Sequence, residues 1–596
     1  MPIGTFARPN VHFMNHFFRS FFAALLALFV FSVITFVGML VFLAVVSASQ
    51  KVETGKNAVL LVDLSNHYSE IEPADPLSKL TGDANGTPPS LYHLTRLIRH
   101  AADDESVEGI FLKCEHNAND FASSEAIRKA LADFRESGKF IIASGNSISQ
   151  TGYYVASIAD RVYCSPIGGV DWNGFSVTMP FLKGTFDKLG IEPQVFYAGK
   201  YKSATEHFRL TQMTEENRVQ TLELLSDVYS NFLKAIADSR KLDSSQLRKY
   251  ADSLTVRYAG DAVKAGMIDG AKYDDEIKDE IRDRLKIDKD DRINFLTPAK
   301  YAQAVKFLPE RGSRIAVIYA EGNIIDGHAE RGQIGGDTYR NMIRKARMDE
   351  SVKAVVLRVN SGGGSVMASE VIWREVILTK KVKPIIISLG DVAASGGYYI
   401  ACGADSIFAE PNTITGSIGV FGLVPNMQNF FNDKLGVTFD EVKTSPNAGP
   451  LTITKPLSAS QRLIFQQQID TAYHDFKTRV SQGRKKSMEY VDSVAQGRIW
   501  SGTRALQLGL VDRLGGLDEA IDAAAAKANL KEYRLREYPD EPGFLEFIKG
   551  KSESSRETNI RKELGEDVYK TFNSLRQIKS IMGNAQARMP FELIIE

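Results

Sequence analysis

The chain repeats itself, and this self-similarity constrains the possible fold more than any other feature of its sequence. SVEGIFLKC at Ser106–Cys114 matches SVKAVVLRV at Ser351–Val359, an offset of 245 residues. The motif GYY recurs at Gly152 and Gly397 with the same offset, and later matches shift it by only a few residues. A period of this length over most of the chain predicts two related domains in tandem.

Each copy alternates two kinds of element. In the second copy, residues 314–322, 353–360 and 383–390 are short runs rich in β-branched side chains, which predict strands. Residues 365–381 and 394–404 between and after them have helical patterns. Buried strands alternating with helices are typical of parallel α/β layers, so we expect an α/β fold.

The N-terminal segment has a different composition from the rest of the chain. Ser20–Gln50 is an uncharged, mainly apolar run of 31 residues. About 20 apolar residues span a bilayer as a helix, whereas the apolar core of a cleaved signal peptide has about 7–15. We therefore expect residues 20–50 to be a retained transmembrane anchor. The small residues at Ala44–Ser49 leave cleavage after the run as the alternative.

The charges around this run predict its orientation. Arg8 and Arg19 precede it, and no acidic residue occurs before Glu53. Positive flanks stay cytoplasmic, so residues 1–19 are expected inside and the long remainder outside, which in a bacterium is the periplasm. The predicted location is the inner membrane, with one span.

Composition and pattern suggest bounds for the remaining parts and exclude some functions. We expect a first repeat at 56–284, a charged, irregular linker at 285–312, a second repeat at 313–532 and a polar, peripheral tail at 533–596. The 73 basic residues balance 73 acidic ones, which argues against a nucleic-acid partner. The three cysteines have no disulfide or zinc spacing and are expected to be buried thiols; they are Cys114, Cys164 and Cys402.

The two copies differ where chemistry would be expected. The second copy has RVNSGGGSV and DVAASGGYY where the first has LKCEHNANDF and NSISQTGYY. Ser395 therefore aligns with Gln150, and Gly396 aligns with Thr151. A serine at a strand-to-helix corner exposes its hydroxyl beside unpaired backbone N–H groups, which can hold an oxyanion. Gly363 or Gly364 in the glycine loop could add a second donor. Two ordinary turns are the alternative.

A nucleophilic serine needs a base. His328 and His474 could approach it in space, although no histidine lies within either glycine motif. The first copy holds Lys200 and Lys202 in YAGKYKSATEHF, and the second copy has no lysine where Lys202 would align. A desolvated lysine can act as a base because burial lowers its pKa from about 10.4. One copy keeps a lysine and the other a serine, which suggests one site built from two halves.

These motifs resemble a known family. DVAASGGYYIACGADSIFAEPNTITGSIGVFG, RVNSGGGSV and YKSATEHF look like the long, tandem-repeat form of the bacterial signal peptide peptidase A (protease IV) family. The resemblance covers nearly all of the chain. It implies two spiral α/β domains of the ClpP/crotonase-like fold and a serine–lysine dyad, with Ser395 as nucleophile and Lys202 as general base.

The resemblance also assigns further roles. It implies that Gly396 and Gly364, and less directly Gly363, donate to the oxyanion, and that Ser417 orients the lysine. The family usually has a proline where this chain has Gly362 in NSGGGS, which loosens the loop and leaves the exact donor open.

The family's function supplies the remaining expectations. They are a membrane-anchored serine endopeptidase that degrades cleaved signal peptides, acts as a homotetramer and requires no metal or cofactor. Its partners would be peptides and the lipid bilayer. Two alternatives remain: a membrane scaffold without catalysis, and a crotonase-like acyl-CoA enzyme, which would need neither the anchor nor the serine.

Overall fold

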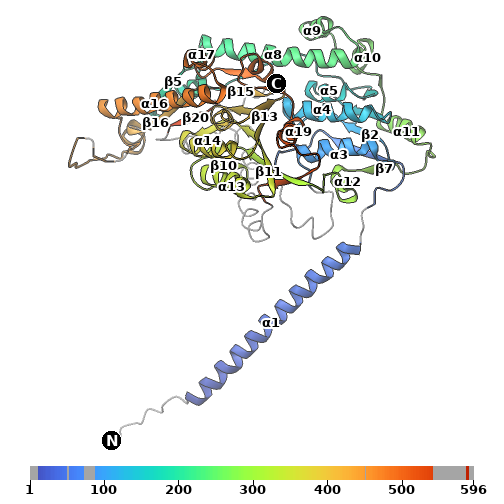
Figure 1. Ribbon diagram of the computed structural model, residues 1–596, viewed down its shortest axis with the longest axis horizontal. Helices are drawn as coiled ribbons and strands as arrows, with labels where there is room; N and C mark the ends of the chain where they lie inside the picture. Colours follow the sequence, from blue (N-terminus) through green and yellow to red (C-terminus); the bar gives the residue numbers. More distant parts are fainter. Residues whose placement is uncertain are drawn as a thin grey trace.

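The chain folds into one long N-terminal helix and a body of two α/β domains (Figure 1). The computed structural model describes residues 11–49, 53–72, 87–446, 448–449, 451–540 and 585–589. The predicted fold class, two tandem α/β domains after one apolar helix, is confirmed.

A six-stranded parallel sheet with the strand order β6-β4-β3-β2-β1-β7 forms the first domain. Its strands are β1 (Ala58–Asp63), β2 (Val107–Lys113), β3 (Phe140–Gly145), β4 (Arg161–Cys164), β6 (Gly270–Ala271) and β7 (Asn294–Leu296). Its longer helices are α3 (Leu91–Asp103), α4 (Phe121–Arg135), α8 (Glu215–Arg240), α9 (Ser244–Ser253) and α11 (Asp274–Leu285); the shorter ones are α5 (Gln150–Ala156), α6 (Lys183–Leu189), α7 (Glu206–Arg209), α10 (Ala259–Lys264) and α12 (Pro298–Ala304). The central strands are nearly continuous apolar runs because helices cover both faces of the sheet.

A larger, mostly parallel sheet with the main order β17-β15-β13-β11-β8-β19 forms the second domain. Its strands are β8 (Ser313–Glu321), β11 (Val352–Ser361), β13 (Ile385–Ala394), β14 (Ser406–Ala409), β15 (Ile414–Gly416), β17 (Ile499–Ser501), β18 (Arg513–Leu514) and β19 (Tyr533–Tyr538). Its helices are α13 (Gly336–Met348), α14 (Val366–Lys380), α15 (Gly396–Ala401), α16 (Ala459–Arg484), α17 (Met488–Val494), α18 (Gly502–Gln507) and α19 (Leu517–Lys527).

The repeat seen in the sequence reappears in the elements. Strand β2 corresponds to β11, helix α5 to α15, and the 26-residue α8 to the 26-residue α16. Both long helices begin at a hydroxyl N-cap, Thr214 and Ser458, whose side chain accepts an N–H bond from the first turn. All three cysteines are free and buried, as expected.

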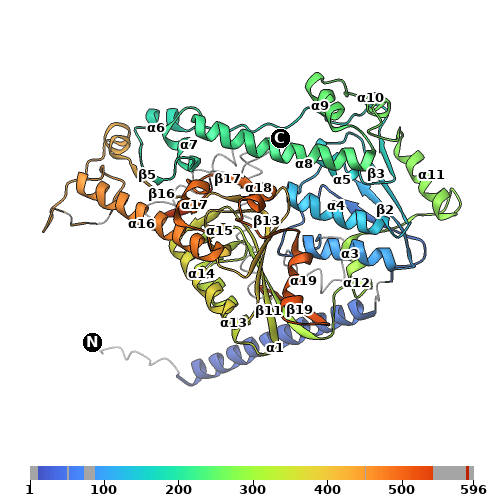
Figure 2. The same cartoon turned by 45° about the horizontal axis from the view of Figure 1, so that its top comes forward.

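A third, mixed sheet joins the domains. Its order is β10-β9-β12-β20-β16-β5, with β5 (Glu192–Ala198), β9 (Asn323–Ile325), β10 (Gln333–Gly335), β12 (Gly363–Ser365), β16 (Val420–Asn426) and β20 (Gln586–Arg588). Strand β5 of the first copy pairs antiparallel with β16 of the second over seven residues, from Ala198↔Val420 to Glu192↔Asn426. Helix α8 reinforces this connection along one side of the body (Figure 2), where Asp227 accepts bonds from Ser501 and Arg504.

The predicted linker and tail contain more structure than their composition suggests. Within 285–312, strand β7 pairs with β1 at the edge of the first sheet, and Leu296 and Tyr301 join the first core. Within 533–596, strand β19 pairs with β8 in the second sheet, and β20 lies inside the mixed sheet. Short apolar groups surrounded by charge carry little sequence signal, which is why these strands were not expected.

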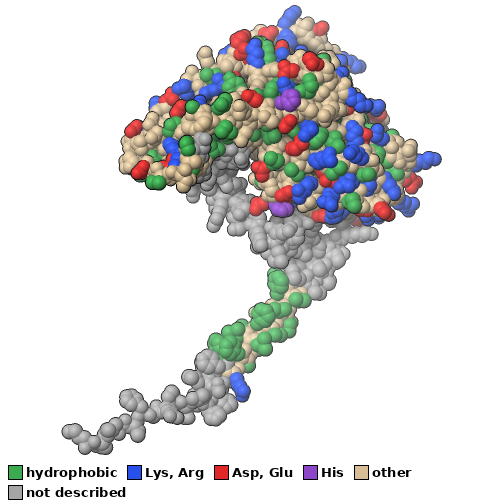
Figure 3. Space-filling model, turned by 60° about the vertical axis from the view of Figure 1, so that its left-hand side comes forward, with side chains coloured by type: hydrophobic (Ala, Val, Ile, Leu, Met, Phe, Trp, Pro, Cys, Tyr) green, Lys and Arg blue, Asp and Glu red, His purple; other side chains and the backbone are tan. Residues whose placement is uncertain are grey.

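Helix α1 (Val11–Ser49) projects away from the body, with its apolar side chains uncovered where the structure describes them (Figure 3). Arg19–Met39 has a mean hydropathy of 2.6 and contributes nothing to the core. An apolar helix of this length whose side chains are exposed over residues 19–39 is suited to a bilayer.

A buried ion pair and several buried hydrogen bonds lie at the contact between the two domains. Arg358 on β11 donates to the carboxylate of Glu70 from the first domain at 2.6 and 2.8 Å, and both side chains are less than 5% exposed. The same guanidinium donates to Ser388 Oγ and to the Leu389 carbonyl. Nearby, Asp391 accepts bonds from the backbone and the hydroxyl of Ser123.

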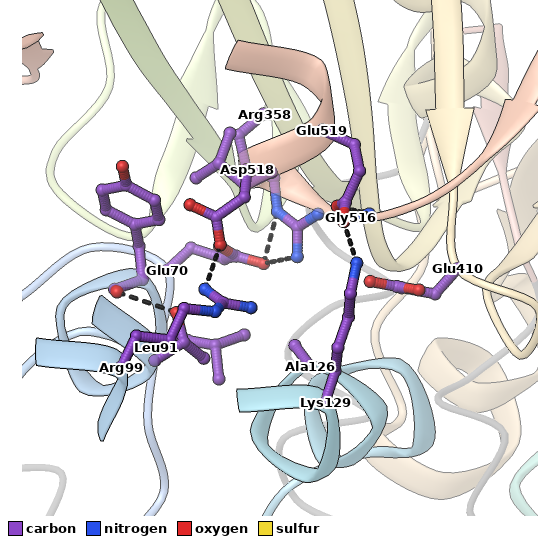
Figure 4. Close-up of a pocket in the computed structure, with 13 residues that line it drawn as sticks. Glu70, Leu91, Arg99, Ala126, Lys129, Arg358, Glu410, Gly516, Asp518 and Glu519 are labelled. Carbon is purple, nitrogen blue, oxygen red and sulfur yellow. Dashed lines mark hydrogen bonds and ion pairs between the residues drawn. The ribbon is translucent and has the colours of Figure 1, made fainter. Parts of the chain in front are cut away.

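A charged pocket lies beside this contact, between α3 and α4 of the first domain and α19 of the second (Figure 4). Across it, Arg99 pairs with Asp518 and Lys129 with Glu519. Pairs of opposite charges, in addition to apolar packing, therefore orient the two domains relative to each other.

We expect Glu70→Ala to destabilise the protein strongly, because it leaves the Arg358 guanidinium buried without its carboxylate. Removing one partner of a buried pair typically lowers the free energy of unfolding by about 3–5 kcal/mol. Chemical denaturation of purified protein, followed by fluorescence, measures the change.

Glu105→Ala is the matched control, because Glu105 is an exposed carboxylate in the same domain. Equal denaturation midpoints for the two variants would show that the buried pair does not stabilise the domain contact.

Candidate active site

Ser395 stands at the corner where β13 ends and α15 begins. Its backbone has φ 55° and ψ −115°, a strained conformation for a residue with a side chain. The Ser395 N–H donates to the Gly416 carbonyl at 2.8 Å, and its own carbonyl accepts from Tyr399 in the new helix at 2.8 Å. The serine is 0% exposed. Two backbone bonds thus hold the strained corner and fix the direction of the hydroxyl.

The following glycines allow the chain to turn this tightly. A Cβ on Gly397 would lie 2.5 Å from the Ser361 carbonyl oxygen. A Cβ on Gly396 would lie 3.1 Å from Gly363 Cα. Larger residues could not let the serine corner and the glycine loop approach so closely.

The pairing of β5 with β16 delivers Lys202 to this corner. Strand β5 ends at Ala198 opposite Val420, so the next residues of the first copy run alongside Ser417 just before β16. The Tyr201 N–H donates to the Gln496 carbonyl at 2.7 Å, and Gln220 on α8 donates to the Tyr201 carbonyl at 3.0 Å. The lysine is therefore positioned by contacts with both copies.

The backbone of Gly497 lies in close contact with the backbone of Lys202. Gly497 has φ 78°, and a Cβ there would lie 2.7 Å from Lys202 Cα. Only glycine combines this φ with so short an approach. Neither Gly497 nor Gln220 belongs to a recognisable motif, so sequence patterns alone do not select them.

The two predicted half-sites meet. Lys202 Nζ lies 2.9 Å from Ser395 Oγ, 3.0 Å from Ser417 Oγ and 3.2 Å from the Ser417 carbonyl oxygen. Lys202 is 2% exposed and Ser417 is 1% exposed. Lys202 therefore contacts both Ser395 and Ser417, and all three side chains predicted for the dyad and its support are buried.

Burial lowers the pKa of the Lys202 ammonium to about 7. No carboxylate forms an ion pair with it among the described residues, so removal from water acts without compensation. As a neutral amine, Lys202 can donate to both oxygens of Ser417 and direct its lone pair at the Ser395 hydroxyl. This arrangement suits proton transfer from serine to lysine.

The glycine loop lies on the other side of the serine. Gly363 (φ 100°) and Gly364 (φ 159°) belong to strand β12, and the backbone of Gly363 lies close to Gly396. The Gly363 N–H is already donated to Ser361 Oγ at 3.1 Å. That leaves the Gly364 N–H as the better placed donor of the two, and it identifies Ser361 as a support of the loop that motif analysis missed.

The other basic candidates are exposed, and none of them is among the described hydrogen-bond partners of the serine. Lys200 has a 65% exposed side chain that pairs with Glu216 at 3.3 Å. His328 and His474 are both exposed. The hydrogen bonds of Ser395 Oγ join it to Lys202 and, at 3.4 Å, to the Gly419 carbonyl.

Comparison with known proteins gives a consistent result. The sequence model described as peptidase family S49 matches residues 133–288 and 377–531, regions that contain Lys202 and Ser395 respectively. Protease 4 of Salmonella typhi is 38% identical over 469 residues, covering 77% of this chain and 75% of that protein. Protease 4 of Haemophilus influenzae is 35% identical over 476 residues, covering 77% and 76%.

Among solved structures, a ClpP1 mutant from Listeria monocytogenes is 13% identical. It covers 34% of this chain and 94% of that chain, with a TM-score of 0.24.

The lowered pKa of Lys202 predicts how the reactivity of Ser395 depends on pH. Below pH 7 the amine is protonated and cannot accept the hydroxyl proton, so labelling by a fluorophosphonate should slow about tenfold per pH unit. Above pH 7 the labelling rate should level off. Rates measured from pH 5 to 9 on full-length protein test this expectation.

Lys200→Ala should show the same pH profile, because the Lys200 side chain is solvated and pairs with Glu216. A labelling rate that is unchanged between pH 5 and 9 would contradict the role of the buried amine.

Proposed function

The chain belongs to peptidase family S49 and is a serine protease, and we propose that Ser395 is its nucleophile and Lys202 its general base. We further propose that it degrades cleaved signal peptides left in the membrane after secretion. The contact of 2.9 Å between Lys202 Nζ and Ser395 Oγ, two buried side chains, carries the catalytic assignment.

The reaction begins with proton transfer. The neutral amine of Lys202 accepts the proton of the Ser395 hydroxyl while the serine oxygen attacks a peptide carbonyl. Ser417 accepts the N–H bonds of the amine and so keeps its lone pair directed at the serine. Ser417 is therefore proposed as a positioning residue.

The tetrahedral intermediate carries negative charge on the former carbonyl oxygen. We assign the backbone N–H groups of Gly396 and Gly364 as its donors, and Gly363 as a residue that shapes the loop. Loss of one such donor typically raises the barrier by about 3–4 kcal/mol.

Collapse of the intermediate breaks the peptide bond. The Lys202 ammonium protonates the leaving amine, and the substrate's acyl group remains as an ester on Ser395. A water molecule then gives a proton to Lys202 and attacks the ester. The ester bond to Ser395 breaks, the serine oxygen takes the proton back from Lys202, and the product leaves as a carboxylic acid that ionises in water. The lysine alternates between base and acid, for which a pKa of about 7 is well suited.

The anchor supports the choice of substrate. Helix α1 would tether the body to a bilayer, where cleaved signal peptides remain, and the flanking Arg8 and Arg19 favour a cytoplasmic N-terminus. The catalytic part would then be periplasmic. A protease confined to this surface encounters apolar peptides leaving the membrane.

The repeat suggests how copies of the chain assemble. At the offset of 245, β5 corresponds to residues 437–443 and β16 to residues 175–181. Neither segment is paired in the chain as described, and Val437, Phe439 and Val442 are exposed apolar residues. If 437–443 of one subunit pairs with 175–181 of the next, every contact repeats head to tail, and the subunits form a ring when the rotation between them closes. We propose that this ring is a homotetramer.

Phe439→Asp should break the proposed ring, because it places a charge in the apolar strand contact. Light scattering of the detergent-solubilised protein should give a tetramer for the unmodified chain and mainly monomer for the variant.

The control is Val382→Asp, which adds the same charge at an exposed valine elsewhere in the second domain. A tetramer that survives Phe439→Asp rules out this contact, and a monomeric unmodified chain rules out the ring.

Separate substitutions test the dyad. Ser395→Ala and Lys202→Ala should each lower kcat/KM for peptide hydrolysis by about a thousandfold or more, because each removes a group that acts in the transition state. Lys200→Ala should stay within about twofold of the unmodified enzyme. Cleavage of a fluorogenic peptide measures all three, with circular dichroism as a check of folding.

Normal cleavage by Lys202→Ala, together with loss of activity in His474→Ala, would overturn the dyad.

A further inference from the structure

Strand β20, from near the end of the chain, lies inside the mixed sheet beside the dyad. It sits between β12, which carries the glycine loop, and β16, which follows Ser417. Without β20, these two strands would face each other with unpaired backbone groups. Facing edges of this kind form a slot that accepts one extended peptide by strand addition.

The register of β20 is specific. The Met589 N–H donates to the Gly362 carbonyl at 2.7 Å, and the Val366 N–H donates to the Ala585 carbonyl at 3.3 Å. Hydrogen-bonded pairs recur at every second residue of an antiparallel ladder. Gly364 and Ala587, paired in register midway between these bonds, are therefore the next hydrogen-bonded pair. The Ala587 carbonyl thus faces the Gly364 N–H.

The same carbonyl lies close to the second proposed oxyanion donor. The position of a Cβ on Gly363 would be 2.1 Å from the Ala587 oxygen and 2.7 Å from the Gly396 nitrogen. A Cβ on Gly396 would be 2.9 Å from that oxygen. The Ala587 carbonyl therefore lies beside the two N–H groups that would hold the oxyanion.

The side chains of Ala587 and Met589 in β20 are buried against the surrounding protein, as the side chains of a bound peptide would be. Ala587 is 0% exposed, so a larger residue at that position would require its surroundings to move. Met589 packs in one apolar cluster with Leu224 and Val228 of α8 and with Ile499 of β17. Both copies of the repeat thus contribute to the slot.

We infer that residues 585–589 occupy the peptide-binding slot of this enzyme as an internal, substrate-like strand. Ala587 takes the position of the residue whose carbonyl Ser395 attacks. This inference rests on the proposed function. It specifies the substrate class as an extended peptide with alanine, or a residue of similar size, at the acyl position and an apolar residue two positions after it.

A tethered occupant competes with free peptides. Because it belongs to the same chain, its effective concentration at the slot is on the order of millimolar. Substrates must therefore displace it, and weakening its fit should increase activity rather than decrease it.

Ala587→Glu in the full-length protein tests the inference. The charge cannot fit at a fully buried alanine, so the segment should leave the slot and the KM for a short peptide should fall at least about fivefold. Ala526→Glu places the same charge at an exposed alanine of α19 and should leave KM unchanged. Melting temperatures of both variants report whether the fold survives.

A binding measurement separates this inference from the proposed catalysis. A fluorescent peptide with the sequence of residues 583–591 is titrated into Ser395→Ala and into Ser395→Ala with Ala587→Glu. We expect at least about tenfold tighter binding to the double variant, in which the slot is vacant.

Equal peptide affinity for the two proteins, or a higher KM in Ala587→Glu, overturns the internal ligand even if the unmodified enzyme cleaves peptides. Absence of hydrolysis by the unmodified enzyme overturns the proposed function instead.

Discussion

The antiparallel pairing of β5 with β16 is the interaction on which the site depends. It carries the end of the first copy's strand to Ser417 of the second, and from there only four residues reach Lys202. A long ladder positions the backbone more firmly than a single side-chain contact. The ladder can therefore hold the amine in a place where water cannot solvate it.

Burial without a counter-charge then sets the chemistry of the amine. A lysine paired with a carboxylate would stay protonated and could not act as a base. Among the described residues, the hydrogen bonds of the Lys202 amine all go to hydroxyl and carbonyl oxygens. Burying an ionisable group in this way destabilises the fold. At the domain contact, by contrast, the buried charges of Arg358 and Glu70 are paired with each other. Paired charges lie at the contact between the two domains, whereas the proposed reaction uses the Lys202 amine, which has no carboxylate partner among the described residues.

Much of this organisation follows from the sequence, and the limits have physical reasons. Repetition predicted two related α/β domains, and comparing the copies selected Ser395 and Lys202 because each is missing from the other copy. Supports such as Gln220 and Gly497 act through tertiary contacts that no local pattern encodes. Strand β20 also could not be predicted from the sequence. It consists of a few residues in a polar tail, and these pair with strands more than 150 residues away.

The duplicated architecture has an evolutionary consequence. The first copy has no counterpart of the Ser395 hydroxyl, and the second copy has no counterpart of the Lys202 amine. A single substitution therefore could not make either copy an independent homomeric enzyme. Splitting the gene within 285–312 would leave two products that must find each other by diffusion before either could work. Fusion therefore fixes a strict one-to-one stoichiometry of amine and hydroxyl. It also leaves the position of Gln150, which aligns with Ser395, free to change by mutation.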